Sequence, residues 1–448
     1  MNNVLDFGAK GDGVTKDTAA IQRAIDAGGM VLLPPGTYLS GTLYLKSNGG
    51  LYLEPGAVLL ASPDKEDYNA PDFCQQNGFF IPELSFGAHF IVALEQENIT
   101  IAGGGRIDGN RRAFFGTTDK VEDEWSFDIF GPLMPGYMPE DFWRPSQMLF
   151  ICECNNVRVQ DVHLFDSPYW SCFFHGCEDV ICTGLRVETD QRTPNGDGID
   201  IDCCRRVTVS NCIIDTGDDC ITLRGASKRL KNPKPCEYVT VSNCVLHTTR
   251  CNAIRIAVGD NVIRHAAFSN IVFHHTRTGI CIMPQYGLGS KGVKIHDITF
   301  SNLQMDCTVP FNIATTPYGM REEEGETINY IFINQVRGCA RTASVVQGSR
   351  PEYVNNIFFK DIHMRMVDGG ANRVLAWPHD KPVGEFAEKS TQSAFFVQNV
   401  GSVSFDNVKF EWETSDPIWE YGIIIEDTEN IKLNNTDFGK PTFSRKGN

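Results

Sequence analysis

The chain has few of the features that mark proteins acting on nucleic acids or in membranes. Its 40 Lys and Arg residues are outnumbered by 56 Asp and Glu residues, which gives a formal net charge of −16. Nucleic acids and anionic membrane surfaces favour basic patches, so neither is expected as a partner. No stretch of the sequence approaches the length of apolar residues that a membrane-spanning helix needs.

The first residues, MNNVLDFGAK, lack the basic stretch and apolar run of a secretory signal. The expected location is therefore cytoplasmic, or extracellular if a leader has been trimmed. Sixteen cysteines are present, but no paired Cys-x-x-Cys motif of a metal site is found. Disulfide frameworks belong to short chains with small cores, so we interpret these cysteines as free, buried thiols. Neither a metal nor a cofactor is expected.

A unit that begins Cys-x-x-Val recurs in the middle of the chain. Copies start at Cys154, Cys177, Cys204 and Cys236, which are 23, 27 and 32 residues apart. A period of roughly 20–30 residues indicates a solenoid, and each copy contains short alternating segments separated by Asn, Gly and Asp turns. Because long helical patterns are absent outside residues 17–27, we predict an all-β, single-stranded parallel β-helix. A β-sandwich or propeller is a weaker alternative, since no four-strand blades are evident.

No linker or low-complexity run divides the sequence, so residues 1–448 are predicted to form one β-helix domain. Residues 1–45 form an N-terminal cap region, in which a short helix at 17–27 covers the end of the apolar core. Residues 46–435 form the coils, with loop insertions at 62–90 and 110–145. Both insertions are aromatic and acidic, which suits stacking on sugar rings, although packing on the outer wall is the alternative.

Three aspartates lie in two turns that are flanked by glycine. The first turn is Asn195-Gly196-Asp197-Gly198, and the second, Gly217-Asp218-Asp219, places Asp218 twenty-one residues after Asp197. Hydrolysis of a glycosidic bond needs one protonated carboxyl and one ionised carboxylate, and crowding separates their pKa values. The alternative is that these residues only satisfy β-turn amides. Asp200 and Asp202 follow on one strand face and are interpreted as turn or ladder residues.

These motifs resemble glycoside hydrolase family 28, the polygalacturonase family of right-handed parallel β-helices. The two aspartate turns resemble the family's Asn-Thr-Asp and Gly-Asp-Asp elements. The resemblance implies an inverting enzyme in which Asp218 is the general acid while Asp197 and Asp219 activate water. Other segments similar to the family are residues 5–13, residues 99–109, Arg144-Pro145 and Ser167-Pro168-Tyr169-Trp170. Substrate contacts implied by the resemblance are Asn195, Trp170 and Tyr318.

Two family motifs are altered in this chain. Asn252 stands where the family has a histidine, and an amide can hydrogen-bond but cannot titrate. Cys281 and Met283 stand where the family's Arg-Ile-Lys element holds the galacturonate carboxylate. Without those cations, a uronate beside three aspartates lacks charge compensation. The cleavage subsite is therefore predicted to take a neutral sugar, and substitution by Arg255 or Arg224 is the alternative.

The sequence thus predicts an inverting, metal-independent glycosidase that acts on a pectin-related or other complex glycan. The aromatic insertions are expected to close one end of the cleft and make the enzyme exo-acting. The alternatives are a polygalacturonase with a substituted cation, a lyase or epimerase, and a non-catalytic glycan-binding β-helix. A lyase would need a uronate, a basic side chain and often Ca²⁺. The expected partner is an oligosaccharide or glycoside.

Overall fold

The computed structural model describes residues 1–78, 85–115, 142–284, 292–315, 326–367, 393–415, 419–428 and 430–445. These residues form two compact units. Unit 1 comprises the described parts of residues 1–221 together with residues 227–235, and unit 2 comprises residues 222–226 and those from 236 onward. The expectation of one domain over residues 1–448, with coils over 46–435, stays a prediction.

Unit 1 is built from short strands with a few helical turns. Its elements are β1 (Asn2–Asn3), η1 (Val4–Phe7), β2 (Asp12–Lys16), α1 (Thr18–Asp26), β3 (Met30–Leu33), β4 (Gly36–Ser40), β5 (Leu43–Tyr44), β6 (Gly49–Leu53), β7 (Ala57–Ala61), η2 (Lys65–Asp67), β8 (Ile91–Leu94), β9 (Glu97–Ala102), β10 (Arg106–Asp108), η4 (Arg111–Ala113), β11 (Leu149–Cys152), β12 (Asn155–Gln160), β13 (His163–Phe165), β14 (Cys172–His175), β15 (Glu178–Thr183), β16 (Arg186–Glu188), β17 (Ile199–Asp202), β18 (Arg205–Ser210) and β19 (Ile213–Asp215).

Unit 2 uses longer strands. Its elements are β21 (Cys236–His247), β22 (Asn252–Gly259), β23 (Val262–Met283), β24 (Lys294–Ala314), β25 (Thr327–Ala340), β26 (Ser344–Gln347), β27 (Val354–Met366), β28 (Ser393–Gln398), β29 (Ser402–Trp412), β30 (Tyr421–Glu426), β31 (Asn430–Asn434) and β32 (Thr442–Arg445). The strand β20 (Ile221–Gly225) begins at the last residue of the 1–221 range and otherwise belongs to unit 2.

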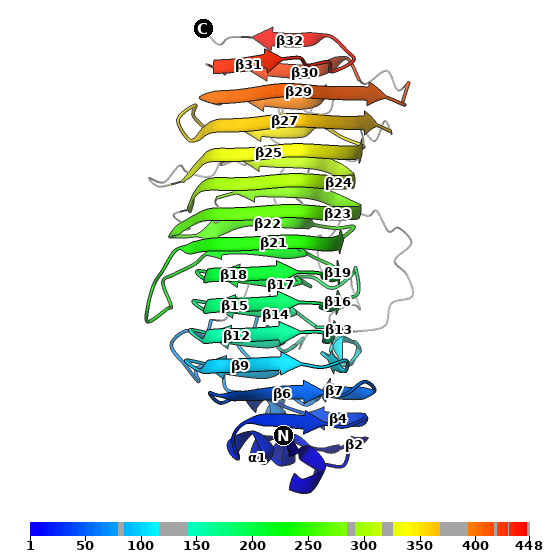
Figure 1. The fold of residues 1–448 in the computed structure, drawn as a ribbon, viewed down its shortest axis with the longest axis vertical. Coiled ribbons are helices and arrows are strands. Elements are labelled where there is room, and N and C mark those ends of the chain that lie inside the picture. The colour runs from blue at the N-terminus through cyan, green and yellow to red at the C-terminus, as the bar shows by residue number, and fades with distance from the viewer. Residues whose placement is uncertain are drawn as a thin grey trace. The chain divides into compact units, whose positions relative to one another are not determined.

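Strands of unit 1 pair in parallel with the strands one coil away. One wall contains β9, β12, β15 and β18, a second contains β8, β11, β14 and β17, and a third contains β7, β10, β13, β16 and β19. Figure 1 shows the first wall as a stack of arrows from β9 to β18. Three parallel strands in each coil, with no crossover helices between them, make a parallel β-helix, as the repeat predicts.

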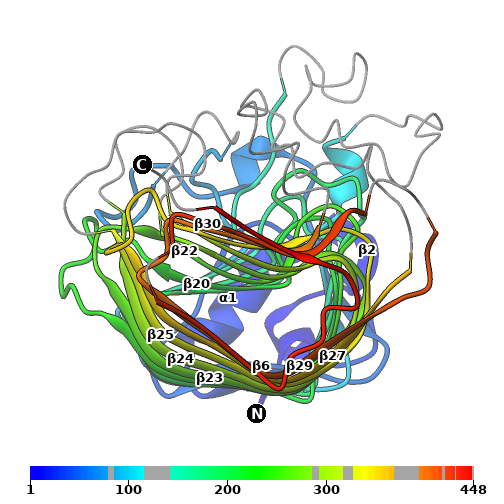
Figure 2. The ribbon, with the colours of Figure 1, turned by 90° about the horizontal axis from the view of Figure 1, so that it is seen from above.

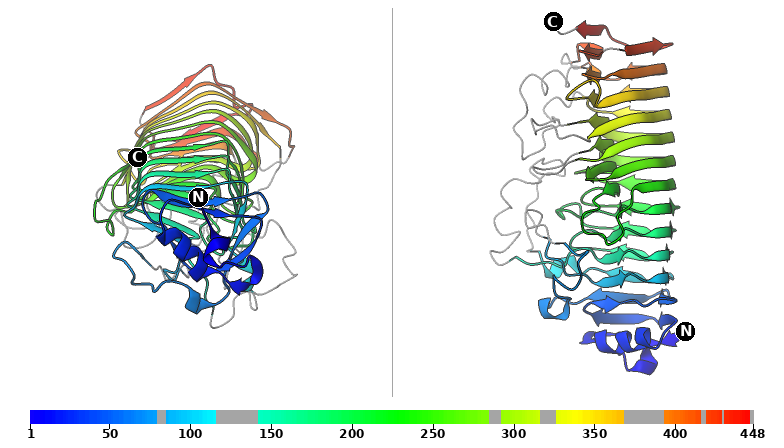
Figure 3. Two further views of the ribbon diagram at one scale, coloured as in Figure 1. Left: turned by 60° about the horizontal axis from the view of Figure 1, so that its bottom comes forward. Right: turned by 90° about the vertical axis from the view of Figure 1, so that its left-hand side faces the viewer.

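Unit 2 follows the same scheme. One row of its strands pairs in parallel in the order β21, β23, β24, β25, β27, β29 and β31. Figure 2 shows these coils nearly superimposed and turning at sharp corners, and Figure 3 shows the strands of each unit stacked at even intervals. Because each strand is in register with the next, side chains at equivalent positions form rows along the stack.

The recurring cysteines link one coil of unit 1 to the coil before it. The Cys154 thiol donates to the Ala93 carbonyl at 3.4 Å, the Cys177 thiol donates to the Ile151 carbonyl at 3.2 Å, and Cys204 repeats this contact one coil further on. All sixteen cysteines are free and fourteen are buried, which confirms the interpretation of the cysteines.

Asparagines at the corners stack in a second kind of row. Asn156 Nδ2 donates to Asn98 Oδ1, and Asn98 Nδ2 donates to Asn48 Oδ1, each at 2.7 Å. All three residues have positive φ, a conformation that asparagine adopts more readily than most residues. These residues therefore form an asparagine ladder, which holds successive corners in line.

The predicted capping helix is α1, which lies at the N-terminal end of unit 1 (Figure 1). Its apolar face, with Ile21 and Ile25, is buried. The buried Asp17 carboxylate, just before α1, accepts hydrogen bonds from the amides of Lys10 and Gly11 at 2.7 and 2.9 Å. These bonds tie the Gly-rich segment at residues 5–13 to the cap.

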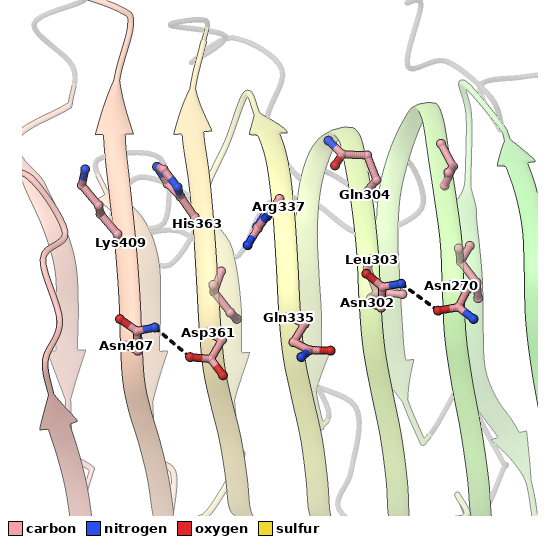
Figure 4. Close-up of a pocket in the computed structure, with 13 residues that line it drawn as sticks. Asn270, Asn302, Leu303, Gln304, Gln335, Arg337, Asp361, His363, Asn407 and Lys409 are labelled. Carbon is pink, nitrogen blue, oxygen red and sulfur yellow. Dashed lines mark hydrogen bonds between the residues drawn. The ribbon is translucent and has the colours of Figure 1, made fainter.

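A polar trough of about 870 Å³ runs over β23, β24, β25, β27 and β29 on the outside of unit 2 (Figure 4). Along it, Asn302 donates to Asn270 and Asn407 donates to Asp361, each at 2.7 Å. None of the site residues predicted from the sequence lines this trough. Within the described residues, no helix has both the length and the apolar character required to cross a bilayer.

The thiols provide a test of the packing. Because burial raises the pKa of buried thiols such as Cys177, we expect no more than the two half-buried cysteines, Cys74 and Cys339, to react with DTNB in the native protein. All sixteen should react after denaturation. Replacing Cys74 and Cys339 with serine should abolish the native reaction. Rapid labelling of several thiols in that double variant would contradict the packing described here.

Candidate active site

The three predicted catalytic aspartates lie where two consecutive coils enter their strands. Asp197 comes just before β17, and Asp218 and Asp219 come just before β20. The Gly198 amide donates to the Asp219 carbonyl at 2.9 Å, so the two turns are joined directly through the backbone. The three residues are 2%, 6% and 0% exposed, respectively. The structure thus brings the predicted carboxylates together on adjacent, buried turns.

Glycines permit this close approach of the two turns. A Cβ atom on Gly217 would lie 2.5 Å from the Asp190 carbonyl oxygen, and one on Gly198 would clash with the Cys220 carbonyl oxygen. A side chain at either position would not fit between the two coils, so both positions require glycine. The Asp219 amide donates to Asp218 Oδ1 at 2.9 Å, which fixes the orientation of the candidate acid.

Asp200 and Asp202 share one face of β17, as the alternation predicts, while Ile199 and Ile201 enter the core. Asp200 is in register with Phe173 of the preceding coil, and Asp202 is in register with His175. His175 Nε2 lies 3.9 Å from Asp202 Oδ2. The carboxylates are therefore gathered on the coil that contains β17, and the equivalent positions of the preceding coil hold the aromatic side chains of Phe173 and His175.

Two other predicted substrate-contact residues of unit 1 have protein partners. Asn195 has a positive φ, and its Oδ1 accepts a hydrogen bond from Arg144 Nη2 at 3.2 Å. Trp170 stacks on Tyr169 with ring centroids 5.1 Å apart and packs edge-on against Phe173. Only 8% of Trp170 is exposed, so it is part of an apolar cluster.

The remaining predicted site residues lie in unit 2. Asn252 begins β22, Arg255 is in direct register with Cys281 of the next coil, and Ala257 is in register with Met283. Arg255, Cys281 and Met283 are all buried. Arg224 lies on β20, and Tyr318 falls outside the described residues.

Comparison with known proteins finds matches to one family of glycosidases. A family model described as Glycosyl hydrolases family 28 matches residues 82–234, and one described as Rhamnogalacturonase A/epimerase, pectate lyase-like, matches residues 1–52. A polygalacturonase of Persea americana is 25% identical over 342 residues, which cover 67% of each chain. An exo-poly-alpha-D-galacturonosidase of Dickeya chrysanthemi is 28% identical over 49% of this chain and 41% of its own length.

A solved family 28 exopolygalacturonase of Yersinia enterocolitica has the same fold, with a TM-score of 0.66 at 21% identity over 97% of this chain and 78% of that chain. These matches support a polygalacturonase-like protein of glycoside hydrolase family 28, and with it a glycoside hydrolase. The predicted right-handed parallel β-helix is confirmed. The match to the Dickeya relative spans less than half of that protein.

One wall of unit 1 is covered on the N-terminal side of the two aspartate turns. Val92, Phe150 and Phe173 form an outward row in register with Asp200. These apolar residues are buried in a cluster with Trp170 and Leu230, against which Phe73 and Cys74 pack. The cover thus comes from residues 73–74 of the first insertion and from Leu230.

Hydrogen bonds hold this cover in place. The Glu153 carboxylate accepts from the amides of Lys231 and Asn232 at 3.1 and 2.7 Å and from Gln76 Nε2 at 2.6 Å. Arg229 also donates to the Asn77 carbonyl. The first insertion was predicted from the sequence. The part of the cover formed by residues 227–232 was not, because these residues carry no repeat or motif signal.

The second insertion contributes a smaller aromatic cluster to unit 1. Phe114, Phe115, Phe142 and Trp143 pack together. The other aromatic residues of residues 110–145 lie outside the described part of the chain. Their predicted stacking on sugar rings stays a prediction.

A half-buried charge network lies next to the two aspartate turns. Asp190 is 3.4 Å from Arg111 and 2.6 Å from Arg192. Burial alone would raise the pKa of Asp190, but the two guanidinium groups lower that pKa to about 2. By contrast, burial raises the pKa of Asp108 and of Asp166. The Asp190 carbonyl oxygen lies next to Gly217, as the clash of a Cβ there shows. The charge network is therefore in contact with the second turn.

Asp190→Asn should destabilise the protein at neutral pH. Because the folded pKa is lowered from 3.8 to about 2, the carboxylate stabilises the fold above pH 4 by about 2 kcal/mol, and this contribution disappears as the pH falls toward 2. Urea unfolding at pH 7 and at pH 3 measures the difference. The control is Asp179→Asn, which removes the exposed pair with Arg206 and should cost under about 1 kcal/mol. Equal losses in the two variants would contradict the assignment.

Proposed function

We propose that this family 28 hydrolase is an inverting, exo-acting glycosidase whose catalytic groups are Asp218, Asp197 and Asp219. The carrying observation is the pair of buried turns joined between Gly198 and Asp219. Asp218 protonates the leaving oxygen. Asp197 and Asp219 take a proton from water, which attacks the anomeric carbon from the opposite side. A carboxyl separation of about 6.5–9.5 Å leaves room for that water and gives inversion.

The covered wall supports exo action. Along the outward row that ends at Asp200, the positions in the preceding coils are apolar and buried under Phe73 and Leu230. A polymer bound at the catalytic turns has no free surface along that row toward the N-terminal coils. We therefore propose that the enzyme removes residues from a chain end or cleaves short glycosides.

For the sugar at the cleavage point, we propose a neutral residue, such as a deoxy sugar. Cys281 and Met283 occupy the positions of the family's carboxylate-holding cations, and both side chains are buried and apolar. A thiol and a thioether suit a methyl group or the apolar face of a sugar better than a carboxylate. The named relatives act on galacturonans, so this proposal departs from them at the subsite.

One observation favours a second candidate, a polygalacturonase with a relocated cation. Arg255 is in register with Cys281, one coil away from the family's arginine position. An arginine there could serve a uronate carboxylate from the adjacent coil. The two candidates differ only in the charge of the sugar that is accepted.

Replacement of a catalytic carboxylate should abolish turnover without unfolding the protein. Asp218→Asn and Asp219→Asn are each expected to lower activity by about 10²-fold or more, because acid–base groups contribute 10²–10⁴-fold. The assay is product release from trigalacturonate and from a p-nitrophenyl α-rhamnoside, with the product anomer read by NMR. Near-normal turnover in either variant would refute the mechanism. Release of an unsaturated product absorbing in the ultraviolet would indicate a lyase.

The altered subsite can be tested by restoring the family residues. Cys281→Arg combined with Met283→Lys should lower the KM for trigalacturonate by about tenfold or more, because each cation pairs with the carboxylate. Arg255→Gln in the wild-type background is the matched experiment. If it abolishes uronate turnover that the wild type possesses, the relocated cation is correct and the neutral-sugar proposal is wrong.

A further inference from the structure

A single hydroxyl group connects the two catalytic turns. Thr189 follows β16 and is buried, with 4% exposure. Its Oγ1 donates to the Gly196 carbonyl at 3.1 Å and accepts from the Gly217 amide at 3.0 Å. Gly196 precedes Asp197, and Gly217 precedes Asp218. The hydroxyl thus bridges the backbone positions next to the two carboxylates.

Thr189 is itself held firmly. Its amide donates to the Asp215 carbonyl at 2.9 Å, which anchors it to the coil that leads into the second turn. The bridging geometry requires a group that donates and accepts at the same atom, which among side chains of this size means a hydroxyl. Without it, a buried carbonyl and a buried amide lose their partners, which is unfavourable in a site shielded from water.

Arg144 holds the outer side of the first turn. This residue is fully buried, and its Nη1 donates to the carbonyls of Pro168 at 2.9 Å and Pro194 at 2.6 Å. Its Nη2 donates to Asn195 Oδ1, and the guanidinium lies 4.7 Å from the Tyr169 ring centroid. The Arg144 guanidinium therefore holds both Pro194 and Asn195, and Asn195 lies two residues before Asp197.

We propose that Thr189 is a positioning residue that sets the separation between Asp197 and the Asp218–Asp219 pair, with Arg144 steadying the first turn. This inference rests on the proposed function, because an inverting hydrolase needs its carboxylates at a fixed spacing. The backbone bond between Gly198 and Asp219 joins the turns on one side of the carboxylates. The Thr189 hydroxyl joins them on the other side, so the two links together prevent the turns from rotating apart.

The decisive variants are Thr189→Val and Thr189→Ser. Valine keeps the shape but lacks the hydroxyl, so kcat should fall by about 10- to 100-fold with little change in KM, since a misplacement of about 1 Å can cost 10²-fold. Serine keeps the hydroxyl and should restore turnover. The probes are trigalacturonate and the p-nitrophenyl α-rhamnoside. Hydrogen exchange read by mass spectrometry should show faster exchange of the Gly217 amide in the valine variant only.

Different outcomes separate this inference from the proposed function. If Asp218→Asn abolishes hydrolysis while Thr189→Val retains wild-type kcat, the positioning role is wrong and the proposed function stands. If Asp218→Asn leaves turnover intact, the proposed function fails, and the positioning role fails with it. Unchanged exchange at Gly217 in Thr189→Val would overturn the bridge itself. Should the valine variant not fold, Thr189→Cys, a weak donor of similar size, should give an intermediate kcat; wild-type kcat there would count against the role.

Discussion

The structure depends on parallel backbone hydrogen bonding from one coil to the next. Each strand of the catalytic wall meets its neighbour in fixed register, with Leu149 opposite Cys172 and Cys172 opposite Ile199. The residues just before each strand are therefore stacked as well. This places the turns that carry Asp197 and Asp219 against each other, although they are far apart in the sequence. The arrangement of the candidate active site is thus a consequence of the register.

Stacking also concentrates charge, and the protein opposes this with buried donors. Backbone amides, the Thr189 hydroxyl and the Arg144 guanidinium all act on the backbone or the side chains of the catalytic turns. The Arg111 and Arg192 side chains perform the same task at Asp190. An acidic chain can hold carboxylates such as Asp218 and Asp190 in this way, because donors fixed to the coil lie within hydrogen-bond distance of them.

The sequence predicted the features that repeat or that follow a local rule. The Cys-x-x-Val period indicated the coils, the pattern at residues 17–27 indicated α1, and the two glycine-flanked turns indicated the carboxylates. It missed Thr189 and the cover formed with Leu230, because neither belongs to a repeat and each acts through a contact with a distant segment. The register of Arg255 with Cys281 was likewise hidden, since coil lengths vary and the pairing is set by the fold.

That register bears on how specificity changes in a β-helix. Adjacent coils are about 4.8 Å apart, which is within the reach of an arginine side chain. An arginine at position 255 is in register with position 281, so a cation on either coil would reach nearly the same volume. The loss of a cation at one position is then weak evidence against a charged substrate when an arginine occupies the next coil. A neutral sugar is favoured when the Arg255 guanidinium pairs with groups of the protein, and a uronate is favoured when it pairs with the sugar. Which pairing forms depends on the groups of the neighbouring coils rather than on the motif itself.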